Sequence, residues 1–571
     1  MLWLESKMKN SVKDKNLVSS MSQKIALWLC ALTTLVVTPG LTFDPINVPK
    51  FLVLGIGIAI LSLVLRDQFN TFSFEAHKVV ITLSGFLMAL MFVSTLVSDS
   101  NLSTKIFGAP GRQTGLVSYL LLAFVLIFYA LISSGDFIYR LNKLIIQLGL
   151  GLSIYGILQY MGLEIFPYGN AYGSAVFGTF GNSNFLSAFL GMAAVAGFLT
   201  CLNPDYGIRI RILGFLTLIF SNLVIFLSNS QQGFLILAAG AGMGLLLIMS
   251  AKGKYVLASF GSLLYLGGIL LACLAFFNRG PLASNVYQSS LGLRREYWYS
   301  ALQMINNDKF FGVGLDNFGS HYRRSRSLEA IKQNSEIVTD SAHNVFLDLG
   351  SGAGLFVLAT YLILVLYVFL EIYRVIFVKK AADFGYLVLV SVWIAYLVQS
   401  FISINNLGLA IWGWVIPGLL VGYGRTRPIT TQVIKVKESK MNSTATSGKV
   451  YPKSANIIVV LSLILGSSTI PSFVSSVYFY SSLKSGNPIN IKNSALVFPD
   501  DLSRYIYVVT ALLTNGFEVD AREILRIGVK KFPDSFDLWR LYSSLTIATQ
   551  SEIAKAKLEM KRLDPNNPNL K

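Results

Sequence analysis

Charged residues are scarce in this sequence, and their scarcity excludes the commonest class of protein. Asp, Glu, Lys and Arg make up 13% of the 571 residues, whereas hydrophobic residues make up 53%. Soluble globular domains carry about 25% charged residues. The apolar residues instead gather in repeated runs of about 18 to 25 residues, which is the length that crosses a bilayer as a helix. The composition therefore predicts a membrane protein.

Cysteine is also scarce, and its placement excludes two kinds of site. Cys30, Cys201 and Cys273 all lie inside apolar runs, without paired spacing in polar loops. This pattern indicates neither a disulfide framework nor a metal-binding knuckle, and we expect no metal and no cofactor. A signal-peptide cleavage site is lacking too, because no small-residue site follows Leu35. The first apolar run is therefore expected to stay as a helix.

The net charge of +18 has a membrane explanation. Such a charge can indicate nucleic acid, but in membrane proteins Lys and Arg gather in cytoplasmic loops, so we expect no nucleic-acid partner. With the N-terminus inside, the cytoplasmic segments hold about 23 Lys and Arg and the short outer loops about 3. The count predicts a cytoplasmic N-terminus and places segments 279–343 and 482–571 outside. The transmembrane helices are expected near 24–39, 48–65, 79–98, 115–133, 141–162, 184–202, 210–228, 232–250, 255–278, 344–370, 384–402, 407–424 and 456–481.

These runs predict an all-α polytopic membrane protein with about 12 to 13 transmembrane helices, a large extracytoplasmic loop and a small helical C-terminal domain. The predicted parts are a membrane domain over 1–424 with its loop at 279–343, a basic Ser/Thr-rich cytoplasmic linker over 425–454, an extra transmembrane helix over 455–481 and an extracytoplasmic tail over 482–571.

The tail has helical spacing and resembles tetratricopeptide repeats. The step from Pro533 to Pro565 is 32 residues, close to the roughly 34-residue period of that helix pair. An unrelated small helical bundle is the alternative. Either form favours a docking module, for which an envelope protein is the expected partner.

The polar stretch from Arg294 to Asn344 is where we expect the chemistry. It collects five arginines and two of the three histidines. It starts as an amphipathic helix, with Tyr297, Ala301 and Met304 on one face. Arginine suits phosphate because its planar fork binds two oxygens and stays charged. The alternative is a set of ordinary solvated surface arginines.

Three other places carry candidate site residues. His343 lies where the polar loop becomes a helix; its imidazole can take a proton from a hydroxyl or, when protonated, bind phosphate, with a helix-capping role as the alternative. Asn182 and Asn184 open a helix whose free N–H groups favour an anion. A turn without a ligand is equally consistent with that pattern.

The order of several segments is more specific. GTFGNSNFLSAFL is followed by LSNSQQGFLIL, RREYWYSALQMI, FGVGLDNF, SAHNVFLDLGSGAGLFVL and QSFISINNLGLAIWGW. This order resembles the O-antigen ligase and polymerase superfamily over roughly residues 20–425. The resemblance implies a glycosyltransferase of the bacterial inner membrane, in lipopolysaccharide or polysaccharide biosynthesis. It implies a glycan donor on undecaprenyl diphosphate, membrane lipid around it, and a lipid A core, glycan or protein as acceptor on the extracytoplasmic face.

The same resemblance assigns residues. It implies that His343 is the essential histidine and that Arg294 or Arg295 is the essential loop arginine. Family members commonly have Ser-Arg-Gly where this chain has Ser230, Gln231, Gln232 and Gly233. Glutamine can donate a hydrogen bond to the donor diphosphate but supplies no charge. Arg323 or Arg324 is the expected source of that charge.

Two other functions compete with the glycosyltransferase. A transporter should place charges at mid-membrane and show two matching halves, and the sequence shows few such charges and no clear repeat. A non-catalytic envelope scaffold is the third interpretation, favoured by the replacement of the arginine by Gln231 and Gln232.

Overall fold

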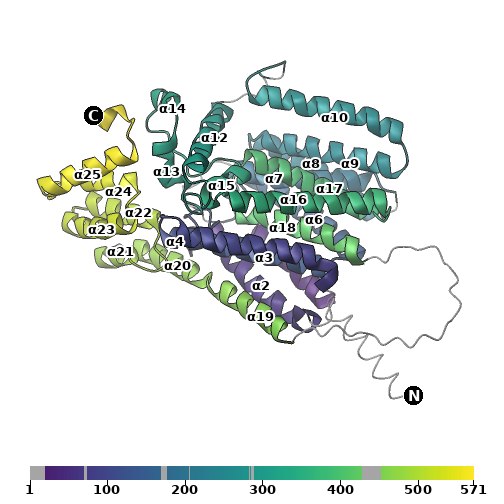
Figure 1. Ribbon diagram of the computed structural model, residues 1–571, viewed down its shortest axis with the longest axis horizontal. Coiled ribbons are helices and arrows are strands. Elements are labelled where there is room, and N and C mark those ends of the chain that lie inside the picture. Colours follow the sequence, from purple (N-terminus) through teal and green to yellow (C-terminus); the bar gives the residue numbers. More distant parts are fainter. Residues whose placement is uncertain are drawn as a thin grey trace.

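The computed structural model describes residues 20–69, 74–166, 168, 176–204, 206–281, 283, 289–426 and 452–570. Residues 20–35 form the first helix, and all regular structure in the described part is helical (Figure 1). The long apolar helices are α2 (Asn47–Phe69), α3 (Phe74–Val97), α5 (Leu116–Ile132), α6 (Gly135–Tyr160), α7 (Ser183–Cys201), α8 (Ile208–Leu227), α9 (Gln232–Ala251), α10 (Tyr255–Phe276), α16 (Leu355–Tyr373), α17 (Phe384–Ile402), α18 (Leu407–Thr426), α19 (Pro452–Ser467) and α20 (Ile470–Ser485).

These helices confirm an all-α polytopic membrane protein. Within the described residues, eleven spans are long and apolar enough to cross a bilayer. Each coincides with a predicted run; of the other two runs, one forms the helix at 20–35 and one the 17-residue α5. Helices are required here because a chain in lipid must satisfy its own backbone N–H and C=O groups.

The bundle has a packed centre and a lipid-facing edge. In α18, 94% of the apolar stretch is buried, against 6% in α10, which lies at the outside of the bundle (Figure 1). Helices α7 and α8 approach closely at Gly197 and Gly214, where a Cβ on Gly197 would lie 2.5 Å from the Gly214 oxygen. Small residues permit such close contact between membrane helices.

The predicted helix 344–370 is divided in two. Helix α15 (Val345–Ala353) ends at Gly354, whose φ of +87° is open to glycine but strained for other residues, and α16 follows. The loop 309–314 packs into this break: the N–H groups of Val313 and Gly314 donate to the Ser351 and Gly352 carbonyls at 2.8 and 2.9 Å. The Gly-Val-Gly turn thereby fixes the helix that starts beside His343. The run at 456–481 is likewise divided, into α19 and α20.

The polar helices gather at one end of the bundle (Figure 1). They come from two parts of the chain, because the C-terminal helices lie beside those of the 294–344 stretch, with α13 against α25. Sequence-adjacent tail helices pack together, namely α22 with α23 and α24 with α25; the tetratricopeptide assignment stays a prediction. These elements are α4 (Leu102–Phe107), α12 (Ser289–Asn307), α13 (Phe318–Ser325), α14 (Leu328–Gln333), α21 (Pro488–Ser494), α22 (Leu502–Thr514), α23 (Glu518–Lys531), α24 (Phe536–Ser543), α25 (Gln550–Leu563) and the short η3 (Pro568–Leu570). The short η2 (Arg374–Val378) instead continues α16. The linker predicted at 425–454 lies almost wholly outside the described residues.

Candidate active site

His343 is presented by a tightly held turn at the start of α15. Asn344 caps the helix, accepting the N–H groups of Phe346 and Leu347 at 3.0 and 3.1 Å. The His343 N–H donates to the Ser341 hydroxyl at 2.9 Å. His343 itself has a φ of +53°, a conformation that costs a non-glycine residue about 1–3 kcal/mol and is kept only where its surroundings enforce it. Strain of this kind is typical of functional sites.

The surroundings of the His343 ring keep it neutral. The ring lies nearly parallel to Tyr297 of α12, with centroids 5.4 Å apart. Burial, and then the nearby charge of Arg294, lower the pKa of His343 to about 4, against a smaller opposing effect of Asp340. At neutral pH the imidazole is therefore uncharged, and it suits proton acceptance from a hydroxyl better than binding of phosphate.

His343 opens into a cavity of about 570 Å³, here called the His343 cavity. One wall is the 294–344 stretch and another is the C-terminal domain. Its lining includes Tyr297, Arg323 and Asp340 from the loop and Leu502, Phe532 and Phe536 from the tail.

Arg294 and Arg295 lie differently although they are neighbours on α12. Arg294 is partly buried, and burial lowers its pKa. Its position one helical turn before Tyr297 and Trp298 places it on the side of α12 that carries those rings. Arg295 is exposed. Of the two arginines, Arg294 is the one whose charge lowers the pKa of His343.

A large apolar groove of about 1,090 Å³ ends at the same helix. It runs between α9, α10 and α17, and its lining also includes Trp298. Phe401 of α17 lines the groove, and its carbonyl accepts the Asn344 side-chain N–H at 3.0 Å. Phe401 therefore links the wall of the groove to the residue next to His343. Its apolar lining, between lipid-facing helices, suits an acyl or isoprenoid chain.

Arg112 is not a residue that the sequence pattern predicted for this site, but its charge also lowers the pKa of His343. It is buried and forms an ion pair with Asp316 at 3.2 Å, with Asp340 and Asp348 both at 3.9 Å. Burial lowers the pKa of Arg112, but these carboxylates outweigh burial and raise it. The sequence does contain one sign of it. Arg112 is a single arginine in the Gly-Pro-rich turn GAPGRQT, which is predicted to lie on the same side of the membrane as the 294–344 stretch.

Arg323 and Arg324 hold the tail in place. Arg323 pairs with Asp564 at 3.4 Å and lies over the Phe536 ring at 4.2 Å. Arg324 pairs with Asp534 at 3.5 Å. Arg323 still lines the His343 cavity, whereas Arg324 lines a different cavity with His321. Their ion pairs give both residues a structural role.

The remaining predicted residues lie at the α7 and α9 helix starts. Asn182 caps α7, and the Asn184 side chain accepts the Ser230 hydroxyl at 2.8 Å, so the two helix starts are joined. Gln231 is exposed, while Gln232 is buried and its side-chain amide has no hydrogen-bond partner among the described residues. The structure brings this group near the groove helix α9 but gives none of its members a contact with His343.

Residues 215–362 match the model of the O-Antigen ligase family. The match runs from α8 to α16 and includes α9, α10, Arg294 and His343. This part of the chain is therefore similar to membrane proteins of the O-antigen ligase family. No curated protein matches the sequence.

A titration of the three histidines tests the neutral state of His343. In the full chain with ¹³C-labelled histidine, we expect the His343 NMR signal to titrate with a pKa of about 4, well below the value of about 6.5 for an ordinary histidine. Because the folded protein resists protonation, stability is expected to fall as the pH drops from about 6.5 toward 4. Signals are assigned with single histidine variants, and a His343 midpoint above 6 would contradict the prediction.

The Asp564 ion pairs predict a large contribution to the free energy with which the tail docks on the loop. Asp564 and Arg326 have fully buried side chains and two contacts of 2.9 and 2.7 Å. Asp564→Ala leaves buried guanidinium groups unpaired and is expected to weaken tail docking by about 3–5 kcal/mol. Glu336→Gln is the control, because it removes an exposed 3.9 Å pair with Arg540, worth at most about 1 kcal/mol. Hydrogen exchange of α13 and α25 measures both, and equal effects would contradict the assignment.

Proposed function

We propose that this chain is a membrane glycosyltransferase that transfers a glycan from undecaprenyl diphosphate to an acceptor on the extracytoplasmic face, as a ligase or a polymerase. The observation that carries the proposal is a neutral His343 that feels the charge of Arg294 on α12, the helix whose Trp298 lines the apolar groove. The family match over the same helices supports it. The acceptor is a lipid A core, another glycan or a protein.

The groove and the loop bind different parts of the donor. The isoprenoid chain lies in the apolar groove, which opens between membrane helices. The diphosphate then lies near Trp298, within reach of Arg294 one turn earlier on α12. A guanidinium group stabilises the negative charge that develops on the diphosphate, which is electrostatic catalysis.

His343 acts on the acceptor. The acceptor hydroxyl oxygen attacks C1 of the donor sugar while the bond from C1 to the diphosphate oxygen breaks. The hydroxyl proton passes to a ring nitrogen of His343, and the lipid diphosphate leaves with the bonding electrons. Attack from the face opposite the leaving group inverts C1.

The proposal assigns parts of the chain to the two sides of a bacterial inner membrane. The N-terminus and the linker over 425–454 are cytoplasmic, and the loop over 279–343 and the tail over 482–571 are extracytoplasmic. The asymmetry of Lys and Arg supports this orientation. Residues 1–424 form the catalytic membrane domain, and 455–481 return the chain to the outside.

A reconstituted reaction tests the activity. The full chain in liposomes is given a glycan linked to undecaprenyl diphosphate and a candidate acceptor. We expect glycan on the acceptor and release of undecaprenyl diphosphate, with no product when a nucleotide sugar replaces the lipid donor. Product from the nucleotide sugar alone would contradict the mechanism.

A deletion strain separates the two subtypes. Its surface glycan is run on a gel beside that of the parent strain. Loss of all long chains on lipid A identifies a ligase, and a single-unit band identifies a polymerase. An unchanged glycan would contradict both.

A further inference from the structure

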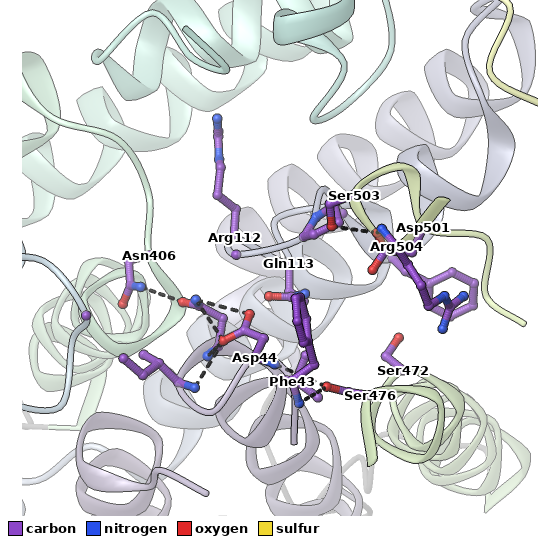
Figure 2. Close-up of a pocket in the computed structure, with 18 of the residues that line it drawn as sticks. Phe43, Asp44, Arg112, Gln113, Asn406, Ser472, Ser476, Asp501, Ser503 and Arg504 are labelled. Carbon is purple, nitrogen blue, oxygen red and sulfur yellow. Dashed lines mark hydrogen bonds between the residues drawn. The ribbon is translucent and has the colours of Figure 1, made fainter. Parts of the chain in front are cut away.

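A second polar cavity lies where the membrane domain meets residues 452–570, here called the C-terminal extension. Its volume is about 490 Å³, and its walls come from segments far apart in the chain (Figure 2). Residues 43–48 and 107–113 form part of it, and α20 and the start of α22 close it. The parts are joined at Ser476 of α20, whose hydroxyl accepts the N–H groups of Phe43 and Asp44 at 3.1 and 3.3 Å. The extension thus completes the cavity.

The lining of this α20 cavity holds buried polar atoms that lack partners. The Ser472 hydroxyl and the Gln113 side-chain oxygen are buried without a hydrogen bond in the described part of the chain. A buried polar group without a partner costs about 1–3 kcal/mol. A ligand toward which these two side chains turn would supply the missing bonds. Both atoms belong to residues that Figure 2 shows around the cavity.

The charges of the cavity favour a neutral ligand. The carboxylates of Asp44, Asp340, Asp500 and Asp501 line it, and the terminal N–H groups of its two arginines have partners, while the Nε–H of each is buried without one in the described part of the chain. Arg112 pairs with Asp316, and Arg504 donates to the carbonyls of Val497 and Pro499. An anionic group would meet more carboxylates than available cations, whereas a polyol donates its hydroxyl hydrogens to them.

The cavity also offers apolar surface of the kind that covers the faces of a sugar ring. Phe43 and Phe180 line it, and Phe43 packs against Phe479 of α20 with ring centroids 4.6 Å apart. Apolar walls with a few placed polar groups are typical of small-molecule sites.

The α20 cavity leads toward His343. Pro110 and Asp340 line both it and the His343 cavity. Arg112 lines the α20 cavity, its side chain points away from α20 (Figure 2), and it donates to the Asp340 carbonyl at 2.7 Å. None of its lining residues belongs to the apolar groove. The α20 cavity therefore adjoins the His343 cavity and is separate from the apolar groove.

We propose that the α20 cavity binds the neutral, hydroxyl-bearing glycan end of the acceptor, and that the C-terminal extension supplies one of its walls. This rests on the proposed function, because it makes the cavity the acceptor side of that reaction. The acceptor enters from the side opposite the lipid donor, and its terminal sugar reaches His343 past Asp340.

The binding test uses the purified full chain in detergent and saturation-transfer NMR. The probes are methyl glycosides of glucose, galactose and N-acetylglucosamine, each with its 6-phosphate. We expect at least one neutral glycoside to bind, and its 6-phosphate to bind about tenfold more weakly or not at all. Absence of binding by all neutral glycosides, or equal binding of the phosphates, would overturn the proposal.

Matched variants on α20 test whether the glycosides bind in the α20 cavity. Ser472→Phe fills the cavity and is expected to abolish the signal, while Val474→Phe adds the same ring two residues away at a 55% exposed position and leaves it unchanged. Ser472→Ala removes only the hydroxyl, keeps the fold and weakens binding severalfold. Binding that survives Ser472→Phe and Ser472→Ala alike would overturn the proposal.

His343→Ala separates this inference from the proposed function. The variant should lose transfer and keep glycoside binding, since His343 does not line the α20 cavity. If the wild-type chain binds glycosides at Ser472 but transfers nothing, the proposed function fails and the glycan site stands. If transfer occurs without Ser472-dependent binding, the proposed function stands and this site fails.

Discussion

Replacing His343 with alanine is expected to lower glycan transfer by about 10²–10⁴-fold, the range that general base catalysis contributes. The imidazole lies against Tyr297, is neutral at physiological pH and opens into the cavity between loop and tail. Its removal leaves the acceptor hydroxyl with no positioned group to take its proton. Initial rates in liposomes with a lipid-linked donor measure the effect, and the lipid donor should still bind.

His321→Ala is the matched control. His321 belongs to the same polar stretch, and burial also lowers its pKa to about 4. Its ring nitrogen contacts the Asn317 carbonyl at 3.1 Å, and it lines the separate cavity with Arg324. We expect its transfer rate to stay near that of the wild type. Equal rates for wild type and His343→Ala would remove the proposed role of His343.

The membrane fold could be predicted from the sequence because a lipid bilayer permits few backbone conformations. A run of apolar residues in a bilayer must be a helix, so run length and position give the spans. What run length does not show is a break inside an apolar stretch. The division between α15 and α16 depends on Gly354, whose left-handed backbone lets the loop 309–314 donate to the end of α15. That contact joins segments about 40 residues apart and produces no periodic pattern in the sequence.

The candidate site could be predicted in part for the same reason. His343 and Arg294 stand out because polar residues are rare here, and the structure brings them together. Arg112 was missed because its partners Asp316 and Asp340 are more than 200 residues away in the sequence. Arg323 and Arg324 were expected to bind phosphate, but composition cannot show that the tail provides Asp564 and Asp534 as their partners. Only tertiary packing shows that these arginines hold the tail, and their phosphate-binding role stays a prediction.

Arg294→Ala is expected to reduce transfer by about 10²–10³-fold, the loss typical when one group that stabilises developing negative charge is removed. Arg294 is partly buried on the side of α12 that carries Trp298 and Tyr297. Arg295→Ala is the control, because this neighbour is exposed and should keep its rate close to wild type. Comparable losses in the two variants would show that Arg294 has no special role.

The same substitution should also move the pH dependence of the reaction. Arg294 is the largest charge effect lowering the pKa of His343, so its removal makes the imidazole easier to protonate. The acidic limb of the rate profile, which lies near pH 4 in the wild type, should shift upward toward 6.5 in Arg294→Ala. Arg294→Lys keeps a positive charge, so the acidic limb should stay near pH 4. Its transfer rate should still fall, because lysine cannot hold two phosphate oxygens in one planar fork. A limb that stays in place in Arg294→Ala would mean that the two side chains are not coupled, and that diphosphate stabilisation and proton transfer belong to separate parts of the loop.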